Sequence, residues 1–102
     1  MRQLVNPHDR PLIYGEADNF ARVMQTLAHP TRIQILSMLL TSPDGVRPVR
    51  MMNDLGVSQP GLSWHLRSLF GEGFAVCEQR GRPYLAAPDA LRYVADLLGG
   101  PR

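Results

Sequence analysis

The chain has 102 residues, which is enough for one compact domain and too few for two. Its single cysteine excludes an intramolecular disulfide, and no apolar run approaches the roughly 18 residues that a membrane span requires. The formal net charge of +2 is weak evidence for a nucleic-acid partner, although all 11 basic residues are arginine. We therefore expect a small cytoplasmic domain with no membrane partner.

The first predicted element is a helix that follows an N-terminal arm. Residues 1–15 show no clear hydrophobic period, which is typical of an arm. From Glu16 the pattern becomes helical, with apolar residues at the spacing i, i+3, i+4, i+7. This apolar stripe consists of Phe20, Val23, Met24 and Leu27.

The stretch LAHPTRIQILSMLL contains the second predicted helix. It begins at Pro30, because the missing N–H of proline costs nothing in the first turn of a helix. Two apolar faces are predicted, one of Ile33, Leu36 and Leu40 and the other of Ile35 and Leu39. A helix that is apolar on two sides is expected to be central and buried.

Two further helices follow in quick succession. The first is short, begins at Pro48 and ends at Gly56, with Met51, Met52 and Leu55 inward. Ser58 is the expected N-cap of the next helix, which continues to about Gly71. A short helix, a tight glycine turn and a longer helix form the helix-turn-helix pattern.

The C-terminal third predicts a hairpin and a last helix. FAVCEQ and YLAA are strand-like runs joined by a turn at residues 80–83. Pro88 opens the last helix, PDALRYVADLL, whose apolar stripe includes Leu91, Val94 and Leu98. The predicted fold class is mainly α with a small β-hairpin wing, in the order α-α-α-α-β-β-α, over residues 16–98, followed by a tail at 99–102. A lone domain of this size cannot cover the stripes of both the first and the last helix, which favours a homodimer.

The helix after Ser58 is expected to bind DNA. Leu62, Leu66 and Leu69 lie within about 40 degrees on one face, which is the core face. Such a helix can enter the major groove by its N-terminal end, where Gln59, Ser63 and Trp64 contact bases and Ser58 and Arg67 contact phosphate. Arg67 reads a guanine instead if it reaches one. The full predicted DNA-binding set is Ser58, Gln59, Pro60, Ser63, Trp64, Arg67, Arg80 and Arg82.

The two arginines at the hairpin tip, Arg80 and Arg82, could reach a backbone phosphate or the minor groove. Purely structural interpretations, without DNA contact, also exist for individual residues. An exposed Arg67 alone is usually a solvated residue, and His65 is better explained as a packed or hydrogen-bonded residue at the core edge than as a metal ligand. Trp64 is harder to explain without a partner, because it exposes a large apolar area.

Three stretches, LAHPTRIQILSML, GVSQPGLSWHLRSL and GRPYL, resemble the arsenic-repressor family (ArsR/SmtB type) of winged helix-turn-helix regulators. The resemblance covers about residues 17–98. It implies a homodimer built from the first and last helices, with two recognition helices in successive major grooves of an imperfect palindrome. It also implies repression of a nearby operon that an inducer relieves, although the sequence does not identify the inducer.

The sequence departs from this family at its metal sites. Residues 47–49 match the family's Cys-x-Cys pair on the third helix but contain no thiolate. Asp89 and Asp96 match part of a second site, without any histidine, and the three histidines have no ligand spacing with Cys77. We therefore predict no metal site and no cofactor. Cys77 is interpreted as a small half-buried hydrophobic residue, while a disulfide between two chains remains open.

The favoured function is a sequence-specific DNA-binding transcriptional regulator, expected to be a repressor that lacks the usual metal-binding sites. A first alternative is a family member without its own inducer, controlled by dimer stability, a partner protein or a small apolar ligand. A second alternative is a winged-helix protein-interaction module that no longer binds DNA. An enzyme is the weakest interpretation, because no nucleophile, base and orienting residue line up.

Overall fold

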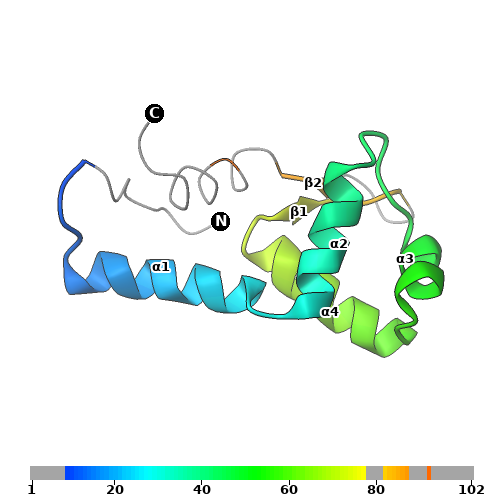
Figure 1. Ribbon diagram of the computed structural model, residues 1–102, viewed down its shortest axis with the longest axis horizontal. Coiled ribbons are helices and arrows are strands. Elements are labelled where there is room, and N and C mark those ends of the chain that lie inside the picture. The colour runs from blue at the N-terminus through cyan, green and yellow to red at the C-terminus, as the bar shows by residue number, and fades with distance from the viewer. Residues whose placement is uncertain (1–8, 78–81, 88–91, 93–102) are drawn as a thin grey trace.

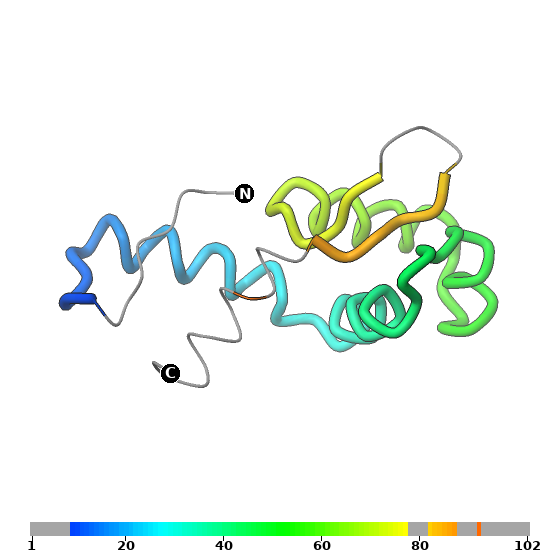
Figure 2. Tube along the Cα trace, turned by 90° about the horizontal axis from the view of Figure 1, so that it is seen from above, coloured from blue at the N-terminus to red at the C-terminus, as the bar shows by residue number. Residues whose placement is uncertain are grey.

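The computed structural model describes residues 9–77, 82–87 and 92, which form four helices and a two-stranded antiparallel sheet (Figure 1). The elements are α1 (Tyr14–Leu27), α2 (Pro30–Leu40), α3 (Pro48–Leu55), α4 (Gln59–Gly71), β1 (Ala75–Val76) and β2 (Leu85–Ala86). Helices α2, α3 and α4 and the sheet form a body from which α1 extends to one side, as Figure 2 also shows. Helix α1 contacts this body through α2 and α4.

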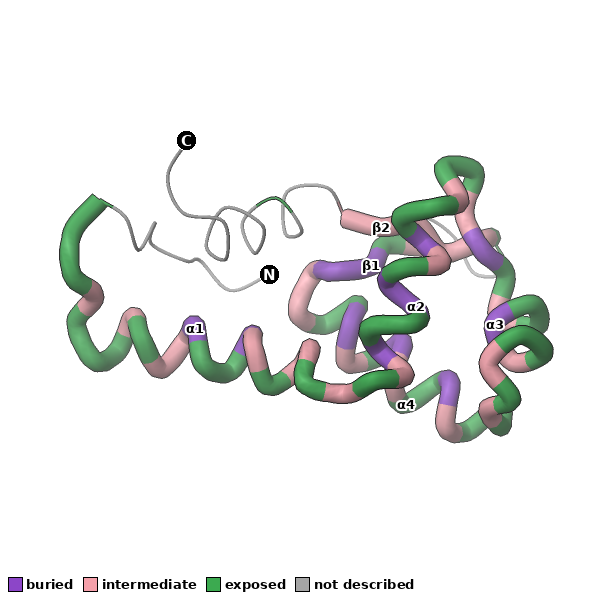
Figure 3. Tube along the Cα trace, in the orientation of Figure 1, coloured by how far each residue is buried: buried purple, intermediate pink, exposed green. Residues whose placement is uncertain are grey.

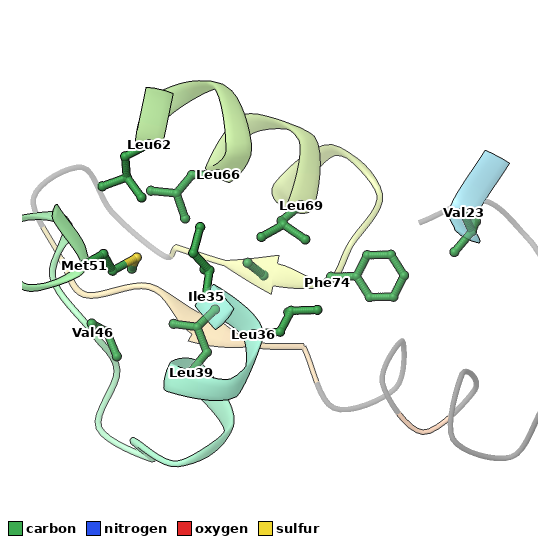
Figure 4. Close-up of a cluster of buried hydrophobic side chains, with 11 residues drawn as sticks. Val23, Ile35, Leu36, Leu39, Val46, Met51, Leu62, Leu66, Leu69 and Phe74 are labelled. Atoms are coloured by element: carbon green, nitrogen blue, oxygen red, sulfur yellow. The ribbon is translucent and has the colours of Figure 1, made fainter. Parts of the chain in front are cut away.

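The hydrophobic core lies between α2, α3, α4 and the sheet. Its buried side chains are Val23, Ile35, Leu36, Leu39, Val46, Met51, Leu62, Leu66, Leu69, Phe74 and Ala75. The three leucines of α4 are buried, which confirms the core face predicted for this helix. Figure 4 shows Leu62 and Leu66 pointing towards Met51 and Ile35. Helix α4 therefore packs against the core with its apolar side, and its other side faces outward.

The burial predicted for α2 is wrong in part. Ile33 is 50% exposed and Leu40 is 57% exposed. The buried stripe consists instead of Arg32, Ile35, Leu36 and Leu39. These positions follow the spacing i, i+3, i+4, i+7 of a single core face, and buried and exposed positions accordingly alternate along α2 in Figure 3. Ile33 and Leu40 lie off this stripe and stay exposed among the described residues.

Helix α1 begins at Tyr14, earlier than the predicted start at Glu16. The Glu16 carboxylate accepts a hydrogen bond from the Ile13 backbone N–H at 3.0 Å and two from the Arg10 guanidinium, at 2.8 and 2.7 Å. The hydrogen bond from Arg10, followed by that from Ile13, lowers the pKa of Glu16 to about 2. Part of the predicted arm is therefore tied to the first turn of α1.

The loop between α2 and α3 is fastened to the hairpin. The Gly45 N–H donates to the Ser42 carbonyl at 2.8 Å, and Val46 and Tyr84 exchange two backbone hydrogen bonds of 2.9 Å each. Gly45 has a φ of +93°, and a Cβ there would lie 2.7 Å from the Pro83 Cβ and 2.9 Å from the Tyr84 carbonyl oxygen. Only glycine allows this close approach, which holds the hairpin beside the start of α3.

The predicted hairpin is confirmed, with Ala75 opposite Ala86 and Val76 opposite Leu85. Other predictions lie outside the described residues. They are the last helix with Leu91, Val94 and Leu98, Arg80 at the hairpin tip, residues 1–8 of the arm and the tail at 99–102. No helix in the described part of the chain is long and apolar enough to cross a membrane.

Candidate nucleic-acid interface

The turn between α3 and α4 is closed at both ends by local hydrogen bonds. Gly56 ends α3 with a φ of +66°, and its N–H donates to the Met52 carbonyl at 2.9 Å. Ser58 caps α4, because its hydroxyl oxygen accepts from the Gly61 N–H at 3.2 Å. The predicted helix stop and N-cap are both confirmed, and the first turn of α4 is left slim and accessible.

The outer face of α4 is exposed as predicted. Gln59, Pro60, Ser63, Trp64 and Arg67 are all exposed, opposite the three buried leucines. Gln59, Ser63 and Arg67 follow one another at intervals of four residues, so they form a row along one side of the helix. Arg67 makes no ion pair with any residue in the described part of the chain. The row therefore offers an amide, a hydroxyl and a guanidinium to a partner.

Trp64 lies on the other side of α4, towards α2. It is 55% exposed, but its ring is held in place. The Arg32 Cζ atom lies 4.8 Å from the centroid of the Trp64 ring, and the His29 ring meets it edge-on with centroids 5.7 Å apart. The exposed part of the indole is thus presented in a fixed position, which the sequence did not predict.

Arg32 is the anchor of this cluster and is only 5% exposed. Its Nε donates to the His65 Nδ1 at 3.0 Å, and its Nη1 donates to the Thr26 carbonyl at 3.0 Å. Burial, the charge of Arg32 and the nearby His29 lower the pKa of His65, which favours the neutral ring that can accept this hydrogen bond. Arg32 thereby links α1, α2 and α4, and His65 is a hydrogen-bonded residue at the core edge, as predicted.

Sequence reasoning missed Arg32, although a signal for it exists. Arg32 occupies the first position of the stripe that Ile35, Leu36 and Leu39 continue. A charged residue on a core stripe needs hydrogen-bond partners, because burial of an unpaired charge costs roughly several kcal/mol of folding free energy. The correct choice of stripe on α2 would therefore have predicted a buried arginine with polar partners from another helix.

A pocket of about 550 Å³ lies between the row on α4 and the hairpin. Its lining includes Met52, Leu66, Arg67, Phe70, Cys77 and Tyr84. Cys77 is half-buried, as interpreted from the sequence, and its thiol donates to the carbonyl of the exposed Arg82 at 3.4 Å. Arg82 is the predicted wing contact that falls within the described residues.

The described residues contain no group of three or more His, Cys, Asp and Glu side chains that could hold a metal ion. Of the positions compared with the family's metal sites, residues 47–49 lie at the start of α3, and Asp89 and Asp96 lie outside the described part. His29 and His65 approach each other with ring centroids 5.9 Å apart, yet His65 already uses its Nδ1 for Arg32. The two histidines are thus part of the cluster around Trp64.

Residues 29–75, from the residue before α2 to the start of β1, match the sequence model of the family described as bacterial regulatory protein, arsR family. Over these residues the chain is similar to an ArsR-family helix-turn-helix domain. A solution NMR structure from Mycobacterium bovis, described as the homodimeric winged helix-turn-helix DNA-binding domain of a possible ArsR-family transcriptional regulator, is 25% identical with a TM-score of 0.64. That match covers 97% of this chain and 88% of the other. No curated protein sequence matches the chain significantly.

This similarity assigns the described elements to parts of a winged helix-turn-helix. Helices α3 and α4 form the helix-turn-helix, and β1 and β2 form the base of the wing. The predicted winged helix-turn-helix fold and the resemblance to the ArsR family are both confirmed.

Proposed function

We propose that the chain is a sequence-specific DNA-binding regulator of transcription that acts as a homodimer and represses the genes it controls. The observation that carries the proposal is the exposed row of Gln59, Ser63 and Arg67 on a capped helix of an ArsR-family domain. The Mycobacterium bovis relative is described as a homodimeric DNA-binding domain, which supports the same assembly and partner here.

In this proposal α4 enters the major groove by its N-terminal half. Gln59 and Ser63 donate to and accept from base edges, while Arg67 contacts a phosphate or the acceptor edge of guanine. Ser58 and the free N–H groups of the first turn lie against a phosphate oxygen, and Pro60 keeps that end narrow. Arg82 and Arg80 of the wing contact the flanking backbone.

Trp64 has a different part in the interface. Because Arg32 and His29 hold its ring, the exposed edge can contact a thymine methyl group or a sugar without first losing side-chain freedom. Its substitution should change the preferred base at one position of the operator rather than abolish binding everywhere.

The dimer interface is proposed to combine the stripe of α1 with Leu91, Val94 and Leu98. Phe20 and Val23 are already buried within one chain, at 8% and 0% exposed. Met24 and Leu27 are half-buried and keep area for a partner, and the neighbouring Tyr14 is 87% exposed. Helix α1, which extends from the body, is thus available to a second copy (Figure 1).

We further propose that release from DNA does not depend on a metal ion, because residues 47–49 supply no thiolate. A footprint on the DNA upstream of the protein's own gene tests the function. Two protected half-sites about 10 base pairs apart, unchanged by a chelator, are expected.

A missing footprint at low salt would favour the alternative, a protein-interaction module. The exposed Trp64 and Phe70, at 55% and 53%, would then be the first places to look for its partner.

A further inference from the structure

The pocket between α4 and the wing is more apolar than contact with DNA requires. Its walls include Met52 from α3, Leu66 and Phe70 from α4, and Tyr84 from the hairpin. Phe70 is 53% exposed at this place, a large apolar area that a phosphate backbone would not cover favourably. A volume of about 550 Å³ is within the range of small-molecule sites.

The charge of the pocket is one-sided. Arg67 is the single charged side chain among the described residues of the lining, and none of them is acidic. Its guanidinium has no ion pair within the described part of the chain, so it can form two parallel hydrogen bonds with a carboxylate or sulfonate. Gln59 and Ser63 add neutral donors on the same wall.

We infer that this pocket binds a small organic anion with an apolar, ring-sized body, whose acid group pairs with Arg67 and whose body packs on Met52, Leu66, Phe70 and Tyr84. The inference rests on the proposed function, because Arg67 and its row are also the proposed DNA contacts. One guanidinium cannot serve the acid group and a phosphate at once. The anion and DNA therefore exclude each other, and the anion releases the regulator from its operator.

The test uses naphthoate as the probe and the uncharged naphthamide as its control. Calorimetric titration of the full chain without DNA is expected to show naphthoate binding at one site per chain, at least about tenfold tighter than naphthamide. Shifts of backbone amide signals are expected at Met52, Phe70, Cys77 and Tyr84 and not in α1. Arg67→Gln should weaken naphthoate about tenfold and leave naphthamide unchanged, whereas Arg22→Gln, an exposed arginine on α1, should change neither.

A second variant separates the pocket from the charge. Met52→Trp fills the apolar wall and keeps Arg67, so it should bind neither probe while still binding DNA. With wild-type protein, naphthoate should raise the Kd for DNA at least about tenfold relative to chloride at equal ionic strength. With Met52→Trp, naphthoate should leave the Kd for DNA unchanged.

Three results would overturn the inference: equal affinity for the acid and the amide, an unchanged affinity in Arg67→Gln, or DNA binding that ignores a bound naphthoate. The last result would leave the proposed function intact. Absence of DNA binding by the protein without naphthoate would instead remove the proposed function and, with it, the regulatory half of the inference.

Discussion

Arg32 connects the core of the domain to the surface that we propose to face DNA. Its guanidinium is buried, donates to His65 on α4 and to Thr26 on α1, and lies against the Trp64 ring. These contacts span three helices, so one side chain fixes how the middle of α4 sits relative to α2. The buried Arg32 thus fixes the position of the exposed Trp64 indole.

Substitution of Arg32 should therefore cost far more than substitution of a surface arginine. Arg32→Ala leaves the His65 Nδ1 and the Thr26 carbonyl without their donors and is expected to lower the free energy of unfolding by about 3 kcal/mol. Arg22→Ala, which breaks an exposed pair with Asp18 at 3.0 Å, should cost at most about 0.5 kcal/mol. Urea unfolding followed by the fluorescence of the single tryptophan measures both, and equal costs would contradict this role.

His65 makes the stability dependent on pH. Its pKa in the folded protein lies below the ordinary value of 6.5, so the unfolded chain takes up the proton more readily than the folded one. By linkage, this contribution to stability is fully present above about pH 6.5 and is lost as the pH falls through the lowered pKa. Unfolding free energies at about pH 7.5 and about pH 5.5 should differ in wild type.

The matched control for this titration is His65→Asn, because an amide oxygen can still accept from Arg32 but does not titrate. The difference in stability between the two pH values should shrink in this variant. If it stays as large as in wild type, another group is responsible.

At the scale of elements, the relation between the wing and the helix-turn-helix depends on one glycine. Gly45→Ala would force a Cβ into contact with the hairpin backbone and require a left-handed backbone at alanine, and we expect a loss of about 3 kcal/mol. Gly15→Ala in α1 meets nothing within 4 Å and should be neutral or stabilising by up to about 1 kcal/mol. Thermal unfolding of the two variants gives the comparison, and a Gly45→Ala protein as stable as wild type would refute the close approach.

Local elements of this fold could be predicted from the sequence because their signals are local. Gly56 indicates the end of α3, and Ser58 indicates the N-cap of α4. The spacing of the leucines in α4 indicates its core face, within a few residues of both. The error on α2 arose because the buried stripe combines residues of both predicted apolar faces, and periodicity alone does not say which side of the helix is covered. The contacts of Arg32 and of Gly45 join segments far apart in the chain, so local sequence patterns do not predict them. The pocket also could not be predicted from the row on α4, because α3 and the hairpin form its other walls.

At the scale of the whole molecule, the proposed function requires a dimer that places two copies of α4 on one operator. Met24→Asp puts a charge on the half-buried stripe of α1 and should weaken dimerisation at least about tenfold. Gln25→Asp adds the same charge at an exposed neighbouring position and should have little effect. Sedimentation equilibrium compares them, with circular dichroism confirming that both variants keep their helices. An unchanged dimer in Met24→Asp would move the interface away from this stripe.

The central claim is that α4 reads DNA through the row on its outer face. The most direct test is the ratio of affinities for the footprinted operator and for a scrambled duplex, measured by fluorescence anisotropy at one fixed salt concentration. For the double variant Gln59→Ala with Ser63→Ala we predict that operator affinity falls by about 10- to 100-fold while affinity for scrambled DNA stays unchanged. An unchanged ratio, or an equal loss on both duplexes, would show that this face does not read the sequence.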